Sequence, residues 1–365
     1  MTRNTRRIIF FGFVLIFLIV TPGVLLYATG YSFDWESKQL IKTGSFYFQS
    51  QPAGAQIKID GKLIDTTPSY VSRLNPGQYQ IQISKDGFLT WQKKLNIEEQ
   101  ITTEARNIFL IPQKLNLELV TDNVTSTKDY FLTEDQRNVQ MQTALIASST
   151  LKDVLGFTLY QSDIYYLQKS NLILFKTDLS GRNKEQISLQ PLPEPGKTDS
   201  GQQKIYQIVI SPEQTAVFQP GGKFYLLDKQ TKIFNLLVDE VQGIEFSSDN
   251  EKILFWTNHE IWMMWLKEIW AQPYRKAQDK ELITRFADKI TSALWLVKTN
   301  EHIIFAVQGN DNNSTIKLTE LDGRDMRNTF DIHSGKISEV YYNQNDDLLY
   351  ILTDGKLYSL DLLRS

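Results

Sequence analysis

The chain has 365 residues, of which 41% are hydrophobic and 12% aromatic, so it has ample material for a core and is not disordered by composition. At about 150 residues a domain, two or more units are expected. The 39 basic and 42 acidic residues give a net charge of −3, which removes the simplest argument for nucleic-acid binding. Because the chain has no cysteine and only three histidines, disulfides and thiolate chemistry are excluded, and little remains for metal or general-base chemistry.

An uncharged apolar run near the amino end predicts a membrane-spanning helix. It covers residues 8–27, which are 20 residues without a charged side chain, and this is about the length needed to cross a hydrocarbon core of roughly 30 Å. Arg3, Arg6 and Arg7 stand just before the run, whereas the first acidic residue, Asp34, comes after it. Since basic residues mark the cytoplasmic end of a span, we expect a cytoplasmic amino-terminal end and an extracytoplasmic body.

A cleaved signal peptide is the alternative interpretation of the same run. The apolar stretch before residues 21–23 (Thr-Pro-Gly) is short enough for a signal peptide, and residues 28–30 (Ala-Thr-Gly) have the small side chains of a cleavage site. Against this interpretation, the apolar run resumes at residues 24–27, where a polar cleavage region would be expected. Either way the body is exported, and without cysteine it has to be held together by its core alone.

Short alternating runs between about Gly44 and Pro112 predict a small antiparallel β-sandwich. Apolar and polar residues alternate along residues 46–49, 56–60 and 78–83, and a period of two indicates strands with one wet face. Turn residues separate the runs, among them the Asp-Gly pairs at residues 60–61 and 86–87. An Asp followed at once by Gly between strands favours a hairpin turn over a metal ligand.

The same stretch resembles the PEGA domain, a β-sandwich module common in exported and surface proteins. The match runs through residues 50–55 (Ser-Gln-Pro-Ala-Gly-Ala), 67–68 (Thr-Pro), 74–79 (Leu-Asn-Pro-Gly-Gln-Tyr) and 85–88 (Lys-Asp-Gly-Phe). Ala53 stands in the place of the Glu of the name-giving Pro-Glu-Gly-Ala tetrad, which is a turn position. The resemblance implies a binding or spacer module, with no catalytic residues to carry over.

Beyond Pro112 no long amphipathic helix is evident, and one theme of apolar strand, polar turn and apolar strand recurs. Its copies cover residues 156–188, 207–237, 243–284, 293–332 and 340–363. A recurrence of roughly forty residues, with several short strands in each copy, is typical of a β-propeller. In every copy except the one from Gly243 a strand ends in Asp followed by a turn, which suits the third strand of a blade turning into the fourth. The copies resemble WD40-like and TolB-like propellers in architecture.

The number of blades is open between five and seven, within the usual range. Residues 115–151 are a candidate for a sixth copy. Their first segment, residues 115–120, is also placed to pair with the last copy and so to close the ring, which would remove an exposed sheet edge. Residues 190–202 contain several Pro and Gly residues and predict a surface loop.

The densest aromatic cluster has two interpretations. Trp262, Trp265 and Trp270 form a candidate binding surface, because flat aromatic side chains cover sugar faces or anchor protein interfaces. Together with Trp256 they are otherwise the core of a blade and its contact with the next blade. This second interpretation is favoured, since propeller blades pack large apolar side chains against each other.

Other candidate sites are weaker. Residues 311–314 (Asp-Asn-Asn-Ser) offer oxygen ligands for calcium, but they lack the spacing, the glycine and the distal Glu of a calcium loop, so a hairpin tip is favoured. The adjacent acids at residues 98–99 and 346–347 would point to opposite faces of a strand, and no nucleophile elbow is present. We therefore predict no catalytic residues, no metal site and no cofactor.

These observations predict an all-β protein with one membrane helix. The expected parts are a cytoplasmic tail (1–7), a transmembrane helix (8–28), a stalk (29–43), a PEGA-like β-sandwich (44–112) and a β-propeller-like domain (113–365). We expect an extracytoplasmic binding or scaffold protein, not an enzyme, that contacts the lipid bilayer through residues 8–28 and engages envelope or surface proteins or cell-wall glycans. An exported hydrolase or lyase with a site at the propeller channel and a purely structural spacer are the alternatives.

Overall fold

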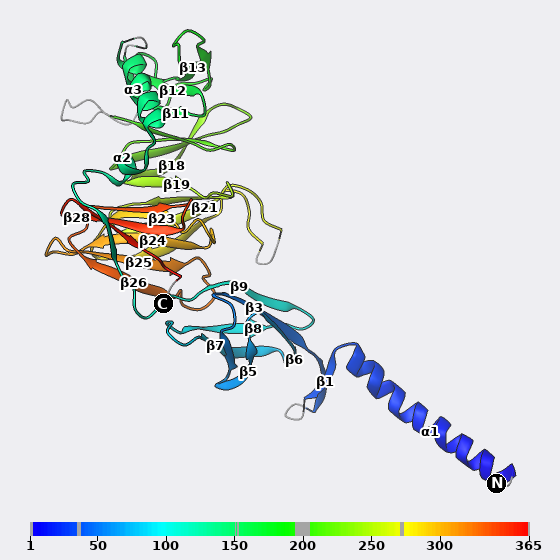
Figure 1. Cartoon of the computed structure of the whole chain (residues 1–365). Helices are drawn as coiled ribbons and strands as arrows, with labels where there is room; N and C mark the ends of the chain where they lie inside the picture. The colour runs from blue at the N-terminus through cyan, green and yellow to red at the C-terminus, as the bar shows by residue number, and fades with distance from the viewer. Residues whose placement is uncertain are drawn as a thin grey trace. The chain divides into compact units, whose positions relative to one another are not determined.

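The computed structural model describes residues 3–34, 38–149, 151, 153–193, 205–270 and 274–363, and the chain forms two compact units (Figure 1). The first unit contains Met1–Leu115 together with Gly323–Asn328 and Leu362–Ser365. The second contains Asn116–Asp322 and Thr329–Asp361. About half of the chain is strand, which confirms the predicted all-β class with an apolar amino-terminal helix.

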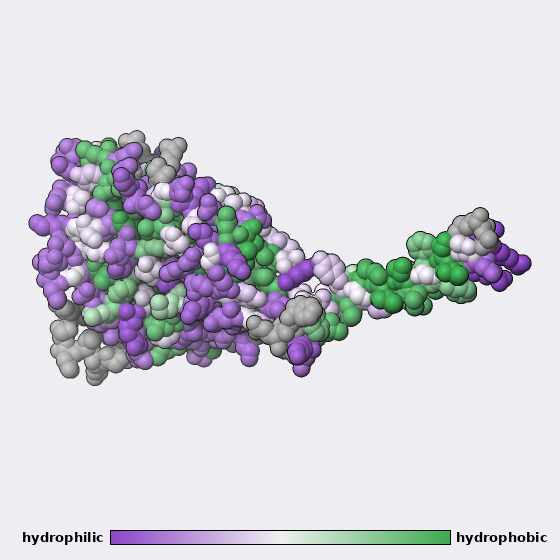
Figure 2. Space-filling model, turned by 90° about the horizontal axis from the view of Figure 1, so that it is seen from below, coloured by the Kyte–Doolittle hydropathy of each residue, from purple (hydrophilic) through white to green (hydrophobic). Residues whose placement is uncertain are grey.

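The amino-terminal helix, α1 (Arg3–Ala28), has no buried residue. Its side chains are apolar along its length, with hydrophilic residues at its amino-terminal tip (Figure 2). Among the described residues it is the one helix that is long and apolar enough to cross a membrane, judged by length and composition. Pro22 lies inside it, near its carboxy-terminal end, where a membrane helix tolerates proline.

The rest of the first unit is a hairpin and a two-layer sandwich. The hairpin pairs β1 (Tyr31–Asp34) with β2 (Gln39–Lys42). One layer has the order β6 (Ser69–Leu74), β3 (Gly44–Gln51), β9 (Thr102–Phe109). The other has the order β5 (Lys62–Thr66), β4 (Gln56–Ile59), β7 (Gly77–Ser84), β8 (Trp91–Ile97). The sandwich is mostly antiparallel as expected, but β3 and β9 pair in parallel.

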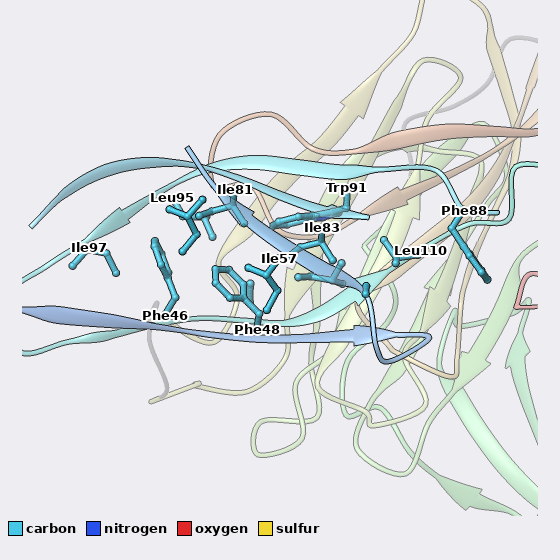
Figure 3. Packing of buried hydrophobic residues seen from close by; sticks show 14 residues of the cluster. Phe46, Phe48, Ile57, Ile81, Ile83, Phe88, Trp91, Leu95, Ile97 and Leu110 are labelled. Atoms are coloured by element: carbon cyan, nitrogen blue, oxygen red, sulfur yellow. The ribbon is translucent and has the colours of Figure 1, made fainter. Parts of the chain in front are cut away.

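The sandwich core uses the residues that the period-two pattern singles out. Phe46, Phe48 and Ile57 are fully buried, and they pack between the two layers against Ile81 and Ile83 (Figure 3). Burial of one such side chain stabilises the fold by about 1.5–3 kcal/mol relative to its exposed state. The intervening polar residues keep the outer faces wet, so the alternation is the physical cause of the two layers.

The predicted Asp-Gly turn after β4 is confirmed. Asp60 and Gly61 have φ angles of 49° and 78°, which is the left-handed pair that a two-residue hairpin turn requires. The Asp60 carboxylate accepts a hydrogen bond from the Gln80 backbone N–H at 2.9 Å. The Asp60 carboxylate thus bonds to the backbone of the neighbouring strand, as expected for a turn residue.

The second unit contains five four-stranded antiparallel sheets. The first has β11 (Val154–Tyr160), β12 (Asp163–Gln168), β13 (Leu174–Asp178) and β14 (Glu185–Gln186). The second has β15 (Gln207–Ile210), β16 (Thr215–Phe218), β17 (Gly222–Leu227) and β18 (Phe234–Val241). The third has β19 (Gly243–Phe246), β20 (Lys252–Trp256), β21 (Glu260–Trp265) and β22 (Lys280–Arg285). The fourth has β23 (Lys289–Trp295), β24 (His302–Gln308), β25 (Ser314–Glu320) and β26 (Thr329–Gly335). The fifth has the order β10 (Glu118–Thr121), β29 (Lys356–Leu360), β28 (Leu348–Thr353), β27 (Glu339–Asn343).

Neighbouring sheets bury their apolar faces against each other, as the blades of a propeller do. Phe224 of the second sheet lies with Phe255 and Met264 of the third in one buried cluster, and Met263 of the third lies with Phe305 of the fourth in another. First strands also meet, since β11 packs against β15, and β23 packs against β19 and β27. The predicted propeller-like architecture is confirmed, with five sheets in the part of the chain that the structure describes.

The fifth sheet takes its outer strand from the start of the unit. Strand β10 pairs with β29, with Glu118 opposite Ser359, so the predicted pairing of this segment with the last copy is confirmed. Asp361 directly follows β29, the third strand of this sheet, and the fourth position is filled by β10. Elsewhere Asp178 and Asp228 stand where the third strand turns into the fourth, as expected.

The prediction of a sixth copy in residues 115–151 is wrong. A helix of 16 residues does follow Pro112, although it is not the amphipathic kind whose absence was noted in the sequence. After β10 the chain forms α2 (Thr127–Phe131) and α3 (Glu134–Ser149), which pack against β27 and β11 respectively. The sequence of α3 is rich in Glu, Gln, Arg, Met, Leu and Ala, which favour helix. The loop expected at residues 190–202 falls largely on 194–204, outside the described residues.

Gly156 on β11 tests how closely the first two sheets approach. A Cβ at this position would lie 2.1 Å from the Tyr206 carbonyl oxygen, so Gly156→Ala should lower the free energy of unfolding by about 2–3 kcal/mol, because backbone must move apart. The measurement is urea unfolding of the full chain in detergent, followed by tryptophan fluorescence.

The matched control is Gly222→Ala, since the three atoms nearest to a Cβ there all belong to the Gln219 side chain, the nearest at 3.2 Å, and we expect a change below about 1 kcal/mol. Equal stability of the two variants would show that β11 does not approach the second sheet as closely as described.

Candidate functional site

The structure separates the tryptophans of the predicted binding surface. Trp262 and Trp265 both lie on β21, three positions apart, so they project from opposite faces of the third sheet. Trp262 packs against the cluster shared with the second sheet, and Trp265 packs against the one shared with the fourth. Trp270 is 79% exposed, and its ring lies 5.4 Å from that of Tyr274. Binding by these residues stays a prediction. Because Trp262 and Trp265 lie on opposite faces of the sheet, the three tryptophans do not form one continuous surface.

A buried cation holds the third and fourth sheets together. The side chain of Lys252 is 3% exposed, and its Nζ lies 3.0 Å from Glu301 Oε1 and 3.4 Å from Asp249 Oδ2. The same ammonium is 5.0 Å from the centre of the Trp265 ring. Burial raises the pKa of Glu301, although the Lys252 charge opposes this rise. Because its charges satisfy one another, the cluster is a structural clamp and offers no free group to a ligand.

Two carboxylates lie on first strands of the third and fifth sheets, and each accepts hydrogen bonds from protein donors. Glu245 on β19 accepts a hydrogen bond from the Trp295 backbone N–H at 3.1 Å. Glu339 on β27 accepts from the N–H and the hydroxyl of Thr127, both at 2.8 Å. Among the described residues no group of three or more His, Cys, Asp or Glu side chains is arranged to hold a metal ion.

Burial has a strong effect on Glu245. It raises the pKa of this carboxyl from its ordinary 4.5 to about 8, and the hydrogen bond from Trp295 and the charge of Lys128 only partly oppose it. At neutral pH the group is therefore mostly protonated. Glu245 is half-buried on β19, and a neutral carboxyl fits this position better than an anion would.

A cleft of about 510 Å³ beside the fourth sheet is the candidate site. Three stretches of chain form it: the link between β22 and β23, the stretch from the end of β24 through the hairpin into β25, and the end of β26. Its lining residues are Phe286, Asp288, Val307, Gly309, Asp311, Asn313, Thr315, Lys317, Ser334 and Gly335.

One wall of the cleft is apolar and fixed. Val307 on β24 is buried, and the Phe286 ring packs against the Phe305 ring with their centres 5.5 Å apart. The backbone N–H of Phe286 donates to the His259 carbonyl oxygen at 2.9 Å, which holds the link between β22 and β23 in place. The Lys317 Nζ lies 5.7 Å from the centre of the Phe286 ring. Phe286 is thus an aromatic surface held by packing on one side.

The rim of the cleft is polar and is built by the β24–β25 hairpin. Asp311 Oδ1 accepts from the Asn313 backbone N–H at 3.1 Å, and Oδ2 accepts from the Asn313 side-chain amide at 2.7 Å. These hydrogen bonds hold the pKa of Asp311 below its usual value, so the rim is anionic at neutral pH. The hydroxyls of Thr315 and Ser334 lie 3.0 Å apart across β25 and β26.

The charges of the cleft determine what it accepts. Asp288 and Asp311 are both acidic, whereas the Lys317 ammonium is paired with Asp331. The cleft therefore repels anions and suits a neutral or cationic ligand. Small-ligand sites are usually lined mostly by apolar side chains with a few polar groups. In this cleft the polar side chains outnumber the apolar ones, which favours a polar ligand.

The sequence identified only one part of this cleft. The hairpin tip predicted for residues 311–314 is confirmed, since β24 and β25 pair from His302 with Glu320 to Gln308 with Ser314. Nothing in the sequence pattern joins Phe286 to this tip, because the two are brought together only by the packing of the third sheet against the fourth.

Comparison with protein families identifies the sandwich of the first unit. Residues 43–109 match the PEGA domain. This stretch is a PEGA domain. Its match covers the sandwich that the turn residues and alternating strands predicted, and the core of the domain is the buried cluster of Figure 3. The comparison with curated proteins finds no match for the chain.

Solved structures similar to the chain are propeller-type proteins. The C-terminal WD40 domain of Sif2 is 13% identical, with 57% of each chain covered and a TM-score of 0.39. YCF48 from Cyanidioschyzon merolae is 10% identical over 87% of this chain and 94% of that one, with a TM-score of 0.39. The tricorn protease is 12% identical over 80% of this chain and 25% of that one, with a TM-score of 0.38. At such scores the architecture of the second unit rests on its own sheet order.

The raised pKa of Glu245 predicts a pH-dependent stability. The pKa of Glu245 is about 8 in the folded chain and near 4.5 in the unfolded chain. Its stabilising contribution to the free energy of unfolding is therefore fully present below about pH 4.5 and is lost as the pH rises to about 8. Glu245→Gln should therefore be more stable than the natural chain at pH 8 by a few kcal/mol, since each pKa unit corresponds to about 1.4 kcal/mol.

Urea unfolding of both chains at pH 5 and pH 8 measures this difference. Glu240→Gln, at an exposed position of β18, is the control and should leave the pH dependence unchanged. If the natural chain and Glu245→Gln lose the same stability between the two pH values, the carboxyl is not buried in the folded state.

Proposed function

We propose that this chain is a membrane-anchored, extracytoplasmic binding protein that holds a neutral or amino-bearing glycan of the cell envelope in the cleft beside its fourth sheet. A PEGA domain next to a propeller-like unit suggests a binding or scaffold role. The single observation that favours binding of a small polar ligand over a pure spacer is the cleft, with the Phe286 ring opposite the Asp311 and Asn313 rim.

Chemistry favours a glycan over other envelope ligands. A sugar ring has an apolar face that can pack on Phe286 and an edge of hydroxyls that can bind Asp311, Asn313 and Thr315. An anionic polymer would meet Asp288 and Asp311 and would be repelled. The volume of about 510 Å³ falls within the range of small-ligand clefts, roughly 300–1,000 Å³.

The amino-terminal helix supports the proposed anchor and its orientation. Helix α1 has the length and composition of a membrane span, and Arg3, Arg6 and Arg7 lie at its amino-terminal end. The positive-inside rule then favours a cytoplasmic amino end and an extracytoplasmic body from about residue 29 onward. A PEGA domain is often extracellular, which agrees with this orientation.

The alternative of an exported hydrolase or lyase would need a second carboxyl facing Glu245. Glu339 is the other acid described above on a first strand, and its carboxylate is engaged by Thr127. A binding role needs no such pair of carboxyls, so the side chains described here support binding better than hydrolysis.

Binding can be tested with the full chain in detergent, using soluble N-acetylglucosamine oligosaccharides and purified peptidoglycan as probes. Replacing the rim with Asp311→Ala and Asn313→Ala, or the wall with Phe286→Leu, should weaken binding more than about tenfold, which corresponds to about 1.4 kcal/mol. Isothermal titration gives the affinity for the oligosaccharides, and co-sedimentation gives it for the insoluble wall.

The control pair is Asp178→Ala with Asn183→Ala. Asp178 likewise accepts from an asparagine side chain and from a backbone N–H, at a turn of the first sheet, outside the cleft. The variant with both control substitutions should bind both probes as tightly as the natural chain does. Absence of binding to both the oligosaccharides and the peptidoglycan would contradict the proposal.

Because the chain has no cysteine, topology can be read from single-cysteine variants. Asn4→Cys lies before the apolar run and Glu240→Cys lies on exposed β18. In intact spheroplasts a membrane-impermeant maleimide should label the second variant at once and the first only after lysis. Equal labelling before and after lysis at Asn4→Cys would reverse the proposed orientation.

A further inference from the structure

Two carboxylates line the cleft beside the fourth sheet without a cationic partner. Asp311 stands on the β24–β25 hairpin, and Asp288 stands on the link between β22 and β23. Neither side chain forms an ion pair with any residue that the structure describes. The lysine among the lining residues, Lys317, is paired with Asp331. The cleft therefore carries two negative charges that no described cation balances.

The link that carries Asp288 is held at both ends by the β20–β21 hairpin. The Phe286 N–H donates to the His259 carbonyl oxygen at 2.9 Å, and the Ile290 N–H donates to the Asn258 carbonyl oxygen at 2.7 Å. Asp288 lies between these two hydrogen bonds, so its position follows from the backbone of the third and fourth sheets. A carboxylate on such a short, fixed segment meets a ligand with little loss of conformational freedom.

Asp311 is held by its own hairpin. Its two oxygens accept from the backbone N–H and the side-chain amide of Asn313, at 3.1 Å and 2.7 Å. A Cβ at Gly309 would lie only 3.2 Å from Asp311 Oδ1, so the glycine leaves room for this carboxylate. A carboxylate has about four acceptor positions. The hydrogen bonds to Asn313 use two of them, and the others remain for a ligand.

The basic residues near the cleft do not neutralise it. Arg285, at the end of β22, is paired with Glu260. Lys289 and Lys336 adjoin lining residues in the sequence but are not among them. Burial lowers the pKa of His333 on β26, so this side chain adds no charge at neutral pH. Acidic groups that line one cleft repel each other and concentrate cations there, and a bound cation relieves that repulsion.

A primary ammonium fits this cleft better than a metal ion. Among the described residues no group of three or more His, Cys, Asp or Glu side chains could hold a metal, whereas an ammonium needs only acceptors for its three N–H groups. The Phe286 ring offers a face to a cation or to the apolar side of a sugar. The hydroxyls of Thr315 and Ser334, 3.0 Å apart, and the Asn313 amide offer partners to sugar hydroxyls. An ammonium beside several hydroxyls is the pattern of an amino sugar.

We infer that the cleft selects a sugar with a free, protonated amino group, the glucosamine of a de-N-acetylated glycan. The ammonium binds Asp288 and Asp311, and the sugar ring packs on Phe286. The inference rests on the proposed function, because it names which of the neutral or amino-bearing glycans the site takes. An acetamide carries no charge and would leave both carboxylates unbalanced, so the de-N-acetylated sugar is preferred.

The experiment compares two probes of equal length, tri-glucosamine and tri-N-acetylglucosamine, on the full chain in a non-ionic detergent. Isothermal titration at low ionic strength gives both affinities. The natural chain should bind tri-glucosamine at least about tenfold more tightly, since two carboxylates favour the ammonium. Added salt should reduce this preference, because it screens exposed charges.

Asp288→Asn removes one charge and keeps the shape of the side chain. It should reduce the preference to about threefold or less and leave the affinity for tri-N-acetylglucosamine unchanged. The matched control is Asp354→Asn, which removes an exposed carboxylate from the corresponding hairpin of the fifth sheet and should keep the full preference. Asparagine tolerates the φ of 48° at this position, and urea unfolding checks that both variants are folded. An equal loss of affinity for both probes in Asp288→Asn would contradict the inference.

Asp331→Asn tests the same charge balance from the other side. This substitution leaves the Lys317 ammonium without its partner, so it adds an unpaired positive charge to the cleft. The preference for tri-glucosamine should again fall to about threefold or less. A preference that stays unchanged in both Asp288→Asn and Asp331→Asn would show that charge does not determine what the cleft binds.

The outcomes separate failure of the inference from failure of the proposed function. Equal affinity of the natural chain for the two probes would overturn amine selection and leave the glycan site standing. Binding of neither probe would overturn both. A third probe, Nα-acetyl-lysine amide, carries an ammonium but no sugar. If it binds as tightly as tri-glucosamine and loses affinity in Asp288→Asn, the ammonium belongs to a peptide and the assignment to a sugar is wrong.

Discussion

The second unit depends on one pairing between residues far apart in the sequence, β10 with β29. Every sheet of this unit has four strands, and the fifth reaches that number only because Glu118 lies opposite Ser359. Without β10, β29 would be an uncovered edge, which recruits other chains. The helices that follow β10 then cover neighbouring strands, with Phe131 of α2 in ring contact with Tyr341 and Tyr350. The first strand of the unit is thus part of its last sheet.

This frame explains why the cleft is at the edge of the third and fourth sheets. The two sheets are clamped by apolar packing and by Lys252, which lies between Asp249 of one and Glu301 of the other. Their facing residues are buried as far as Phe305 and Val307. Beyond that packing, the link before β23 and the β24–β25 hairpin supply the polar side chains that line the cleft. A rigid frame with variable hairpins is the usual way in which loops acquire binding roles.

Local signals account for the parts of the fold that the sequence revealed. Asp60-Gly61 and the alternation through Phe46 and Phe48 specify turns and strands within a few residues, so the sandwich and the five repeating sheets were predictable. Helix α3 was not, because Met141 and Leu145 are exposed while Thr143 is buried, and an amphipathic pattern is therefore weak. The candidate cleft was also hidden, since it joins Phe286 to Asp311 across a sheet interface that no local pattern records. Trp262 and Trp265 were close in sequence yet face apart, as their odd spacing on a strand requires.

The pairing of β10 with β29 also fixes an order of events during biosynthesis. The partner of Glu118 is made about 240 residues later, and at about 5–20 residues per second the wait is roughly 12 to 48 s. Through that interval β10 has strand sequence but no strand to join, and Leu119, which is 58% exposed even in the finished fold, has nothing beside it. The fifth sheet therefore cannot be completed before β29 has been synthesised, and a nascent chain interrupted before Ser359 would leave β10 without its partner.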